Sequence, residues 1–257
     1  MTANYHTHTY RCGHAEGHES EYAKNAFEKG LKVLGFSDHT PYDYFDIGPR
    51  NRPMRMMPEE LEGYVASVKG LAKDYEGRME IYAGLEAEYY PKYFSRLLEM
   101  VRKCGVEYLI LGQHFLFNEV EDTYTGRPFC DEARLKQYVS QSIEGLRSGV
   151  FTYFAHPDLV YFAGEDEMYR EEMRKLCIAA KETDTPLEIN LLGLRTGRNY
   201  PDVRFWEIAG EVGNEVVLGS DAHSPADVLW PVWVERGMEI VKKYSLCLLE
   251  TVKLKKP

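Results

Sequence analysis

Residues 31–39, Leu-Lys-Val-Leu-Gly-Phe-Ser-Asp-His, join a short apolar run to a polar end, and this combination decides the fold. The run Leu31–Ser37 has the nearly continuous apolar character of a strand that is buried on both faces. It ends in Ser37, Asp38 and His39, side chains that can bind a metal or a phosphate. Six other segments of the chain have the same pattern, which predicts a parallel sheet whose polar strand ends converge on one face.

Those six segments also end in residues with nitrogen or oxygen side chains. In chain order their ends are His6-Thr7-His8 with His14 soon after, Gly84-Leu85-Glu86, Gly112-Gln113-His114, Ala155-His156-Pro157, Glu188-Ile189-Asn190 followed by Arg195 and Arg198, and Ser220-Asp221-Ala222-His223. Seven of the eight histidines therefore lie at or just after a predicted strand end, and His18 is interpreted as a polar residue at a helix start. Histidines placed in this way predict a common site.

Segments with apolar residues at helical spacing separate the predicted strands. We expect helices over Glu19–Lys29, from Met57-Pro58 onward, and over Pro91–Lys103, Glu132–Arg147, Glu167–Glu182, Val203–Val212 and Pro225 to Tyr244. Strands that alternate with helices are typical of a parallel sheet with helices on its outer faces. Seven such units favour a barrel. An open doubly wound sheet is the alternative, and its ligands would spread along a crevice instead of converging.

Length and charge set limits on the class of protein. The chain has 257 residues, 44% of them apolar, which suits one globular domain spanning 1–257. The net charge of -10 argues against nucleic-acid binding through a basic face. We find no apolar run long enough for a membrane span and no secretory signal at the N-terminus, so we expect a cytoplasmic protein with reduced cysteines. The sequence leaves the oligomeric state open.

The spacing of the polar residues at two strand ends indicates a metal centre. Alternate residues of a strand point the same way, so His6 and His8 can reach one point, and so can Asp221 and His223. Glu86 adds a carboxylate that can bridge two cations. Imidazole and carboxylate ligands suit zinc and similar divalent metals. One His-x-His is a weak motif, but this set of ligand types at successive strand ends predicts metal binding strongly.

Four stretches of the chain resemble the PHP (polymerase and histidinol phosphatase) family, most closely its histidinol-phosphatase branch. They are HTHTYRCGHAEG from His6, VLGFSDHTPY from Val33, LEINLLGLRTGRNYP from Leu187 and VVLGSDAHSPADV from Val216. The resemblance implies an α/β fold, a distorted (β/α)7 barrel of parallel strands with outer helices. It also implies three divalent metal ions, with zinc, manganese and iron as the candidates.

The resemblance further divides the ligands among the three metals. His6 and His8 would bind the first metal together with Glu86 and Asp221. Glu86 would bridge to a second metal held by His114 and His156. The third metal would be held by His14, His39 and His223.

The implied activity is hydrolysis of L-histidinol phosphate to L-histidinol and phosphate, as in histidine biosynthesis. Bound metal would lower the pKa of water for attack on phosphorus. Asp221 and His223 are candidates for protonating the leaving group. Arg195 is the first candidate for a catalytic and substrate-binding phosphate contact, because arginine can make two parallel hydrogen bonds to phosphate. Arg198 is the second substrate-binding candidate.

One departure from the family pattern leaves undecided which basic residues contact the phosphate. Relatives often have a basic residue soon after the His-Pro-Asp of the fifth strand, whereas here His156-Pro157-Asp158 is followed by Leu-Val-Tyr-Phe. Arg50, Arg52 or Arg127 could supply the missing contact. The alternatives are a phosphatase of this fold with another small phosphomonoester as substrate, such as a nucleotide or phosphotyrosine, and a non-catalytic PHP module.

Several further residues have predicted supporting roles. We expect the loop Pro41–Met57 to form a rim over the site and the tail Lys253–Pro257 to be frayed. Asp38 and Asp158 are predicted to orient the ligand histidines beside them. The candidates for binding the cationic end of the substrate are Glu16, Asp43 and Glu88.

Overall fold

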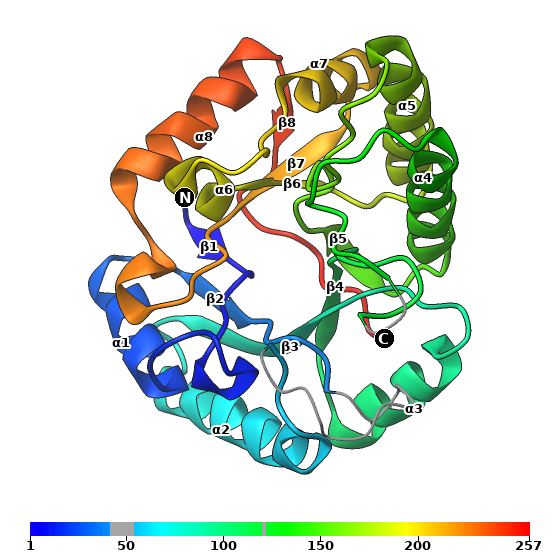
Figure 1. The fold of residues 1–257 in the computed structure, drawn as a ribbon. Helices are drawn as coiled ribbons and strands as arrows, with labels where there is room; N and C mark the ends of the chain where they lie inside the picture. The colour runs from blue at the N-terminus through cyan, green and yellow to red at the C-terminus, as the bar shows by residue number, and fades with distance from the viewer. Residues whose placement is uncertain (42–53, 120–121) are drawn as a thin grey trace.

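In this computed structural model the described residues are 1–41, 54–119 and 122–257, and they form a curled parallel sheet surrounded by helices (Figure 1). Neighbouring strands follow the order of the chain from β1 to β8, and every pair is parallel. The strands are β1 (Ala3–Asn4), β2 (Val33–Phe36), β3 (Glu80–Ala87), β4 (Tyr108–Leu111), β5 (Phe151–Phe154), β6 (Leu187–Asn190), β7 (Glu215–Gly219) and β8 (Cys247–Leu248). The prediction of a parallel α/β barrel is confirmed. The sequential order also excludes the doubly wound alternative, in which the strand order reverses.

Helices cover the outer face of the sheet (Figure 1). They are α1 (Glu19–Glu28), α2 (Leu61–Asp74), α3 (Phe94–Cys104), α4 (Glu132–Arg147), α5 (Asp166–Glu182), α6 (Leu191–Thr196), α7 (Val203–Val212) and α8 (Pro231–Lys243), with 3-10 turns η1 (Tyr10–Cys12), η3 (Pro58–Glu60) and η4 (Pro225–Val228). Apolar side chains between helices and sheet form the larger of two core clusters. This layering leaves the C-terminal ends of the strands open for a site.

The first and last predicted strands meet at the C-terminal end of the barrel. A parallel bridge joins Thr7 to Ala222. The backbone N–H of His8 donates to the carbonyl of Ala222 at 2.9 Å, and the N–H of Ala222 donates to the carbonyl of His6 at 3.2 Å. Residues from the two ends of the chain are therefore held side by side at the site.

Three elements differ from the prediction. Strand β8 was not expected, and it pairs with β7 near its start. The segment Leu191–Thr196, for which no element was predicted, is a short helix that the Asn190 side chain caps by accepting a hydrogen bond from the Gly193 N–H at 3.0 Å. The last helix is divided into η4 and α8, since Pro231 disfavours helical backbone at Trp230, which is extended.

Tyr108 fills the barrel interior. It is fully buried, and its hydroxyl lies 2.8 Å from the carbonyl oxygen of Tyr5 and 2.9 Å from that of Phe36. Its ring passes so close to β3 that a Cβ on Gly84 would lie 2.3 Å from ring carbon atoms. Tyr108 therefore links β4 to the chain at β1 and β2 and requires glycine opposite its ring.

The C-terminal tail is ordered, and the prediction that it is frayed is wrong. Leu254 packs against the interior cluster that contains Tyr108. The backbone N–H of Lys255 donates to Thr152 at 3.1 Å, and its ammonium group donates to Thr185 at 2.8 Å. The tail therefore crosses the N-terminal ends of β5 and β6, opposite the predicted site.

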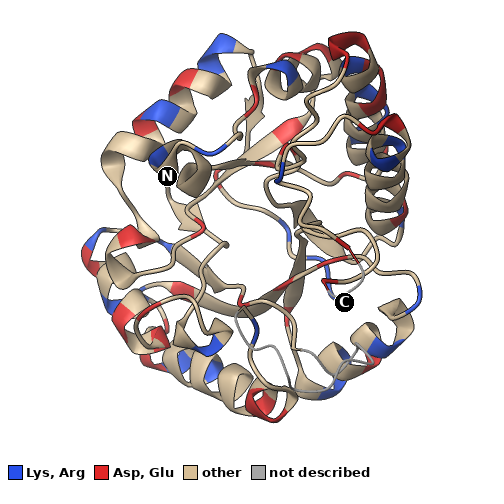
Figure 2. Ribbon diagram, viewed as in Figure 1, with Lys and Arg blue, Asp and Glu red and all other residues tan. Residues whose placement is uncertain are grey.

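Charged residues of both signs alternate over the outer helices (Figure 2). Some of them link neighbouring helices, as where Arg170 of α5 pairs with Glu207 of α7 at 2.8 Å. Within residues 1–41, 54–119 and 122–257, none of the helices combines the length and apolar character that a membrane span requires.

Candidate metal centre and cavity

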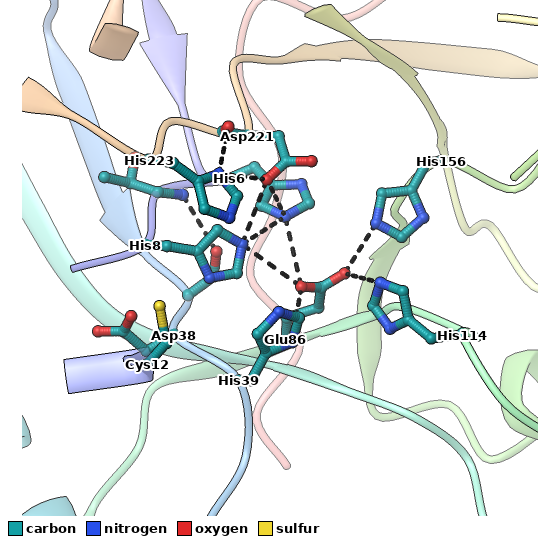
Figure 3. A network of polar contacts seen from close by, with 12 residues as sticks. His6, His8, Cys12, Asp38, His39, Glu86, His114, His156, Asp221 and His223 are labelled. Carbon is teal, nitrogen blue, oxygen red and sulfur yellow. Dashed lines mark hydrogen bonds and ion pairs between the residues drawn. The ribbon is translucent and has the colours of Figure 1, made fainter. Parts of the chain in front are cut away.

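All nine predicted metal ligands gather at the C-terminal ends of the strands (Figure 3). Eight of them line one cavity of about 960 Å³, and His6 lies fully buried beneath it. The cavity wall also contains aromatic side chains from the loops after β4 and β5, including Phe115, Tyr124 and Tyr161. The barrel thus produces the convergence that the sequence predicted.

Glu86 lies at the centre of the cluster, with imidazole rings on both sides (Figure 3). Its Oε1 is 2.9 Å from His156 Nε2 and 3.5 Å from His114 Nε2. Its Oε2 is 3.4 Å from His8 Nε2, 3.6 Å from His6 Nε2 and 3.1 Å from His39 Nδ1. The two oxygens therefore face different groups of ligands, as a carboxylate that bridges two cations must.

Asp221 and His223 bring the last predicted strand end into the same cluster. Asp221 Oδ1 lies 3.5 Å from His6 Nε2 and 3.3 Å from His8 Nε2. His223 Nε2 lies 2.9 Å from His14 Nε2. His39 Nδ1 lies 3.1 Å from Glu86 Oε2, whereas the implied grouping assigns His39 to the third metal with His14 and His223. The division of the ligands among the metals therefore stays a prediction.

The outer nitrogen of several rings is hydrogen-bonded to oxygen. His6 Nδ1 lies 2.7 Å from Glu188 Oε1, and His114 Nδ1 lies 2.9 Å from Glu88 Oε1. His14 Nδ1 and His223 Nδ1 lie 3.1 Å and 3.0 Å from the carbonyl oxygens of Cys12 and Asp221. Each Nδ1 therefore donates to oxygen, and each Nε2 presents a lone pair to the cluster.

This arrangement fits a cation-binding site. The Nε2 atoms of His6 and His8 lie 3.2 Å apart. The Nε2 lone pairs of His14 and His223 face each other at 2.9 Å, which is unfavourable unless a cation lies between them. Two nitrogens on one tetrahedral zinc ion, each about 2.0–2.1 Å away, would be separated by roughly 3.3 Å. The buried Glu86 and Asp221 add negative charge that needs compensation. The donor set and its spacing therefore suit divalent metals.

The protonation states agree with ligand chemistry. Burial alone would raise the pKa of Glu86, but His39, His114 and His6 hold it well below its usual value. Burial and the neighbouring His223 lower the pKa of His8 to about 3. Burial likewise keeps the pKa of His39 well below its usual range. At neutral pH Glu86 is thus ionised, and His8 and His39 are neutral. Nearby carboxylates raise the pKa of His6 and of His114 against the effect of burial, so a metal would displace protons from these two rings.

The model of the PHP domain matches residues 4–191 of the chain, which contain seven of the nine ligand positions. This chain belongs to the PHP family. A relative from Deinococcus radiodurans, named a probable histidinol-phosphatase, is 32% identical over 243 residues, which cover 87% of this chain and 86% of the relative. The histidinol-phosphatase of Bacillus subtilis is 26% identical, and the match covers 87% of this chain and 94% of that protein.

A solved PHP structure has the same fold over almost the whole chain. It is a histidinol phosphate phosphatase from Lactococcus lactis in complex with zinc, L-histidinol and phosphate. The TM-score is 0.74 at 19% sequence identity, and the match covers 99% of each chain. The likeness confirms the fold class inferred from the sequence.

The arginines lie differently from the prediction. Arg195 does not line the cavity, and its guanidinium pairs with Asp227, with nitrogen–oxygen distances of 2.9 and 2.8 Å. Arg198 and Arg127 do line the cavity. The geometry therefore favours Arg198 over Arg195 for phosphate. Arg50 and Arg52, like most of the predicted rim at Pro41–Met57, lie outside the described residues.

Two predicted orienting residues act elsewhere. Asp38 accepts hydrogen bonds from the backbone N–H and the hydroxyl of Thr9, both at 2.7 Å, and so holds the segment that follows His8. Asp158 accepts from the Asp202 N–H at 2.6 Å and the Trp206 indole at 2.8 Å. The prediction that they orient the adjacent histidines is therefore wrong.

The three candidates for binding the cationic end of the substrate lie in different places. Glu16 is exposed and does not line the cavity, and Asp43 lies outside the described residues. Glu88 lines the cavity, but its side chain is buried and bonds to His114, so a contact with the substrate stays a prediction.

Sequence analysis missed the residues that orient the rings of His6 and His114. Glu188 bonds to His6 and also accepts the backbone N–H of His156 at 3.0 Å. Glu88 bonds to His114. A usable signal was present in both cases: Glu188 is a charged residue inside a buried strand, and Glu88 lies two residues after Glu86, so it points the same way.

Proposed function

We propose that this protein hydrolyses L-histidinol phosphate to L-histidinol and phosphate at a centre of three divalent metal ions, with zinc, manganese and iron as candidates. The observation that carries the proposal is the set of imidazole nitrogens that converge on the buried carboxylates Glu86 and Asp221. The names of the Deinococcus and Bacillus relatives support the substrate. So do the ligands of the Lactococcus structure, which shares the fold.

Metals bound at this centre supply Lewis-acid stabilisation of phosphoryl oxygens and lower the pKa of water. The protein holds the negatively charged side chains around the metals in fixed positions. Glu86 and Asp221 are buried anions, whose pKa values the surrounding histidines keep well below the usual range. Asp221 and His223 both line the cavity. Because Asp221 is ionised, His223 is the proposed proton donor to the leaving alkoxide.

Arg198 is the proposed first contact for the substrate phosphate. One of its nitrogens donates to the Tyr200 hydroxyl at 2.8 Å, which fixes the side chain over the cavity and leaves other N–H groups for phosphate. Arg127, on the loop after β4, is the proposed second contact. Within the described part of the chain, neither arginine forms an ion pair with a carboxylate, so both charges are available to an anion.

The test is phosphate release by the purified protein, after its metal content has been measured. L-Histidinol phosphate, a nucleoside monophosphate and an aryl phosphate would be compared. The proposal predicts that kcat/KM for L-histidinol phosphate exceeds the other two values by at least about 100-fold, which is roughly 2.7 kcal/mol of transition-state discrimination. Similar weak activity on all three substrates would keep the reaction but reject the substrate, and metal-loaded protein without any activity would reject both.

A further inference from the structure

Arg55 connects three of the loops that surround the cavity. Its guanidinium is almost fully buried, although the side chain comes from a loop. Its Nη1 donates to the carbonyl oxygen of Thr40, next to His39 at the end of β2, at 3.1 Å. Its Nε donates to Glu119, on the loop after β4, at 2.6 Å, and its Nη2 donates to Glu88 at 2.8 Å. One side chain thus holds together loops that follow β2, β3 and β4.

Glu88 transmits this contact to the metal centre. The same oxygen atom, Oε1, lies 2.8 Å from Arg55 and 2.9 Å from His114 Nδ1. The hydrogen bond to Nδ1 fixes the tautomer, so that Nε2 of His114 presents its lone pair to Glu86 at 3.5 Å. Glu88 borders the cavity, but its side chain is only 1% exposed and its Oε1 is already bonded to both Arg55 and His114.

A contribution to the stability of the fold does not by itself explain why Arg55, Glu88 and Glu119 form a buried ion cluster. Two carboxylates share one guanidinium, and the side chains of Arg55, Glu88 and Glu119 are 4%, 1% and 18% exposed. Desolvation of buried ion pairs cancels much of their attraction, and apolar replacements are often equally stable. The effect that an apolar replacement could not reproduce is the fixed orientation of the His114 ring.

We propose that Glu88, itself held by Arg55, is a positioning residue for His114 and sets the affinity of the metal position that His114 helps to form. The inference rests on the proposed metal centre. Outer carboxylate partners of metal-binding histidines typically contribute 10–100-fold to metal affinity. We therefore expect Glu88→Gln to weaken one metal position by about that factor while the others keep their metal.

The experiment is chelator titration of the zinc-loaded full chain, with zinc retained per chain measured by elemental analysis. Wild type, Glu88→Gln and Arg55→Lys would be compared with Glu172→Gln. Glu172 is a matched control, because it is also a nearly buried carboxylate that pairs with a cation, Lys175 at 2.7 Å, but it lies on the outer helix α5. Thermal unfolding of the metal-free proteins would record any effect on the fold.

The expected result is that one equivalent of zinc leaves Glu88→Gln at chelator concentrations about 10–100-fold lower than wild type and Glu172→Gln require. Arg55→Lys should show a smaller shift in the same equivalent, which keeps the test valid if Glu88→Gln fails to fold. Zinc retention equal to wild type in Glu88→Gln, with or without a lower Tm of the metal-free protein, would overturn the positioning role. A wild-type protein that binds no zinc, manganese or iron would instead overturn the metal centre itself.

Discussion

Replacement of Arg198 by alanine tests which arginine contacts the substrate phosphate. Arg198 lines the cavity, and its hydrogen bond to Tyr200 occupies one of its five N–H donors, so at least two remain for a phosphate. A lost hydrogen bond to a charged group costs about 1.5–3 kcal/mol, which corresponds to a roughly 10–150-fold decrease in kcat/KM. We expect Arg198→Ala to fall in this range with its metal content unchanged, and Arg198→Lys to be intermediate.

Arg195→Ala is the matched control for this measurement. Arg195 is only three residues away, but it pairs with Asp227 outside the cavity. A partly exposed ion pair contributes at most about 1 kcal/mol to stability, so the variant should stay folded. Because Arg195 does not line the cavity, we expect kcat/KM to stay close to the wild-type value. Phosphate release from L-histidinol phosphate would be measured for both variants at saturating metal. A larger loss for Arg195→Ala than for Arg198→Ala would refute the assignment, and a loss of metal in Arg198→Ala would show that its effect is indirect.

Other predictions concern the metal centre and the barrel. Asp221→Asn keeps the shape of the side chain but removes its charge, so we expect lower metal content and no detectable turnover in a folded protein; near-wild-type activity would contradict the metal mechanism. Removal of the metals by a chelator should lower the Tm, because a metal that binds only the folded chain stabilises it and because the facing lone pairs of His14 and His223 then lack a cation between them. An unchanged Tm in scanning calorimetry with and without added zinc would contradict this. Tyr108→Phe removes a buried hydroxyl next to two carbonyl oxygens and should lower the free energy of unfolding by about 1–3 kcal/mol in urea titrations. Gly84→Ala would place a Cβ 2.3 Å from the Tyr108 ring, and a variant as stable as wild type would mean that the barrel interior is packed more loosely than described.

The sequence alone was sufficient to predict the barrel and the residues that converge at the C-terminal ends of its strands, because both depend on local patterns. Continuous apolar runs identify buried strands, and a polar residue at the end of such a run is placed by the strand direction. The roles of Arg195 and Arg198 could not be decided in this way. They lie three residues apart on the segment after β6, and the unpredicted helix α6 determines that Arg195 meets Asp227 while Arg198 lies over the cavity.

The hydrogen-bond partners of the residues around the predicted ligands could not be predicted from the sequence either. Glu88 and Arg55 are separated by 33 residues, and nothing local indicates that they share a hydrogen bond. Asp38 and Asp158 stand beside ligand histidines in the sequence, yet their carboxylates bond to Thr9 and to Asp202. Adjacency along the chain does not predict which way a carboxylate at a strand end points once neighbouring strands offer backbone donors.

The bridge between Thr7 and Ala222 has a consequence for the order of events during synthesis. His6 and His8 are made before strands β2 to β7, whereas Asp221 and His223 are translated after all of these strands. A nascent chain that has not yet released β7 from the ribosome lacks the anion that approaches His6 and His8 within 3.5 Å. The complete ligand set therefore forms only after β7 has been translated, and a chain that terminates before residue 221 cannot assemble the centre, however well its earlier strands have folded.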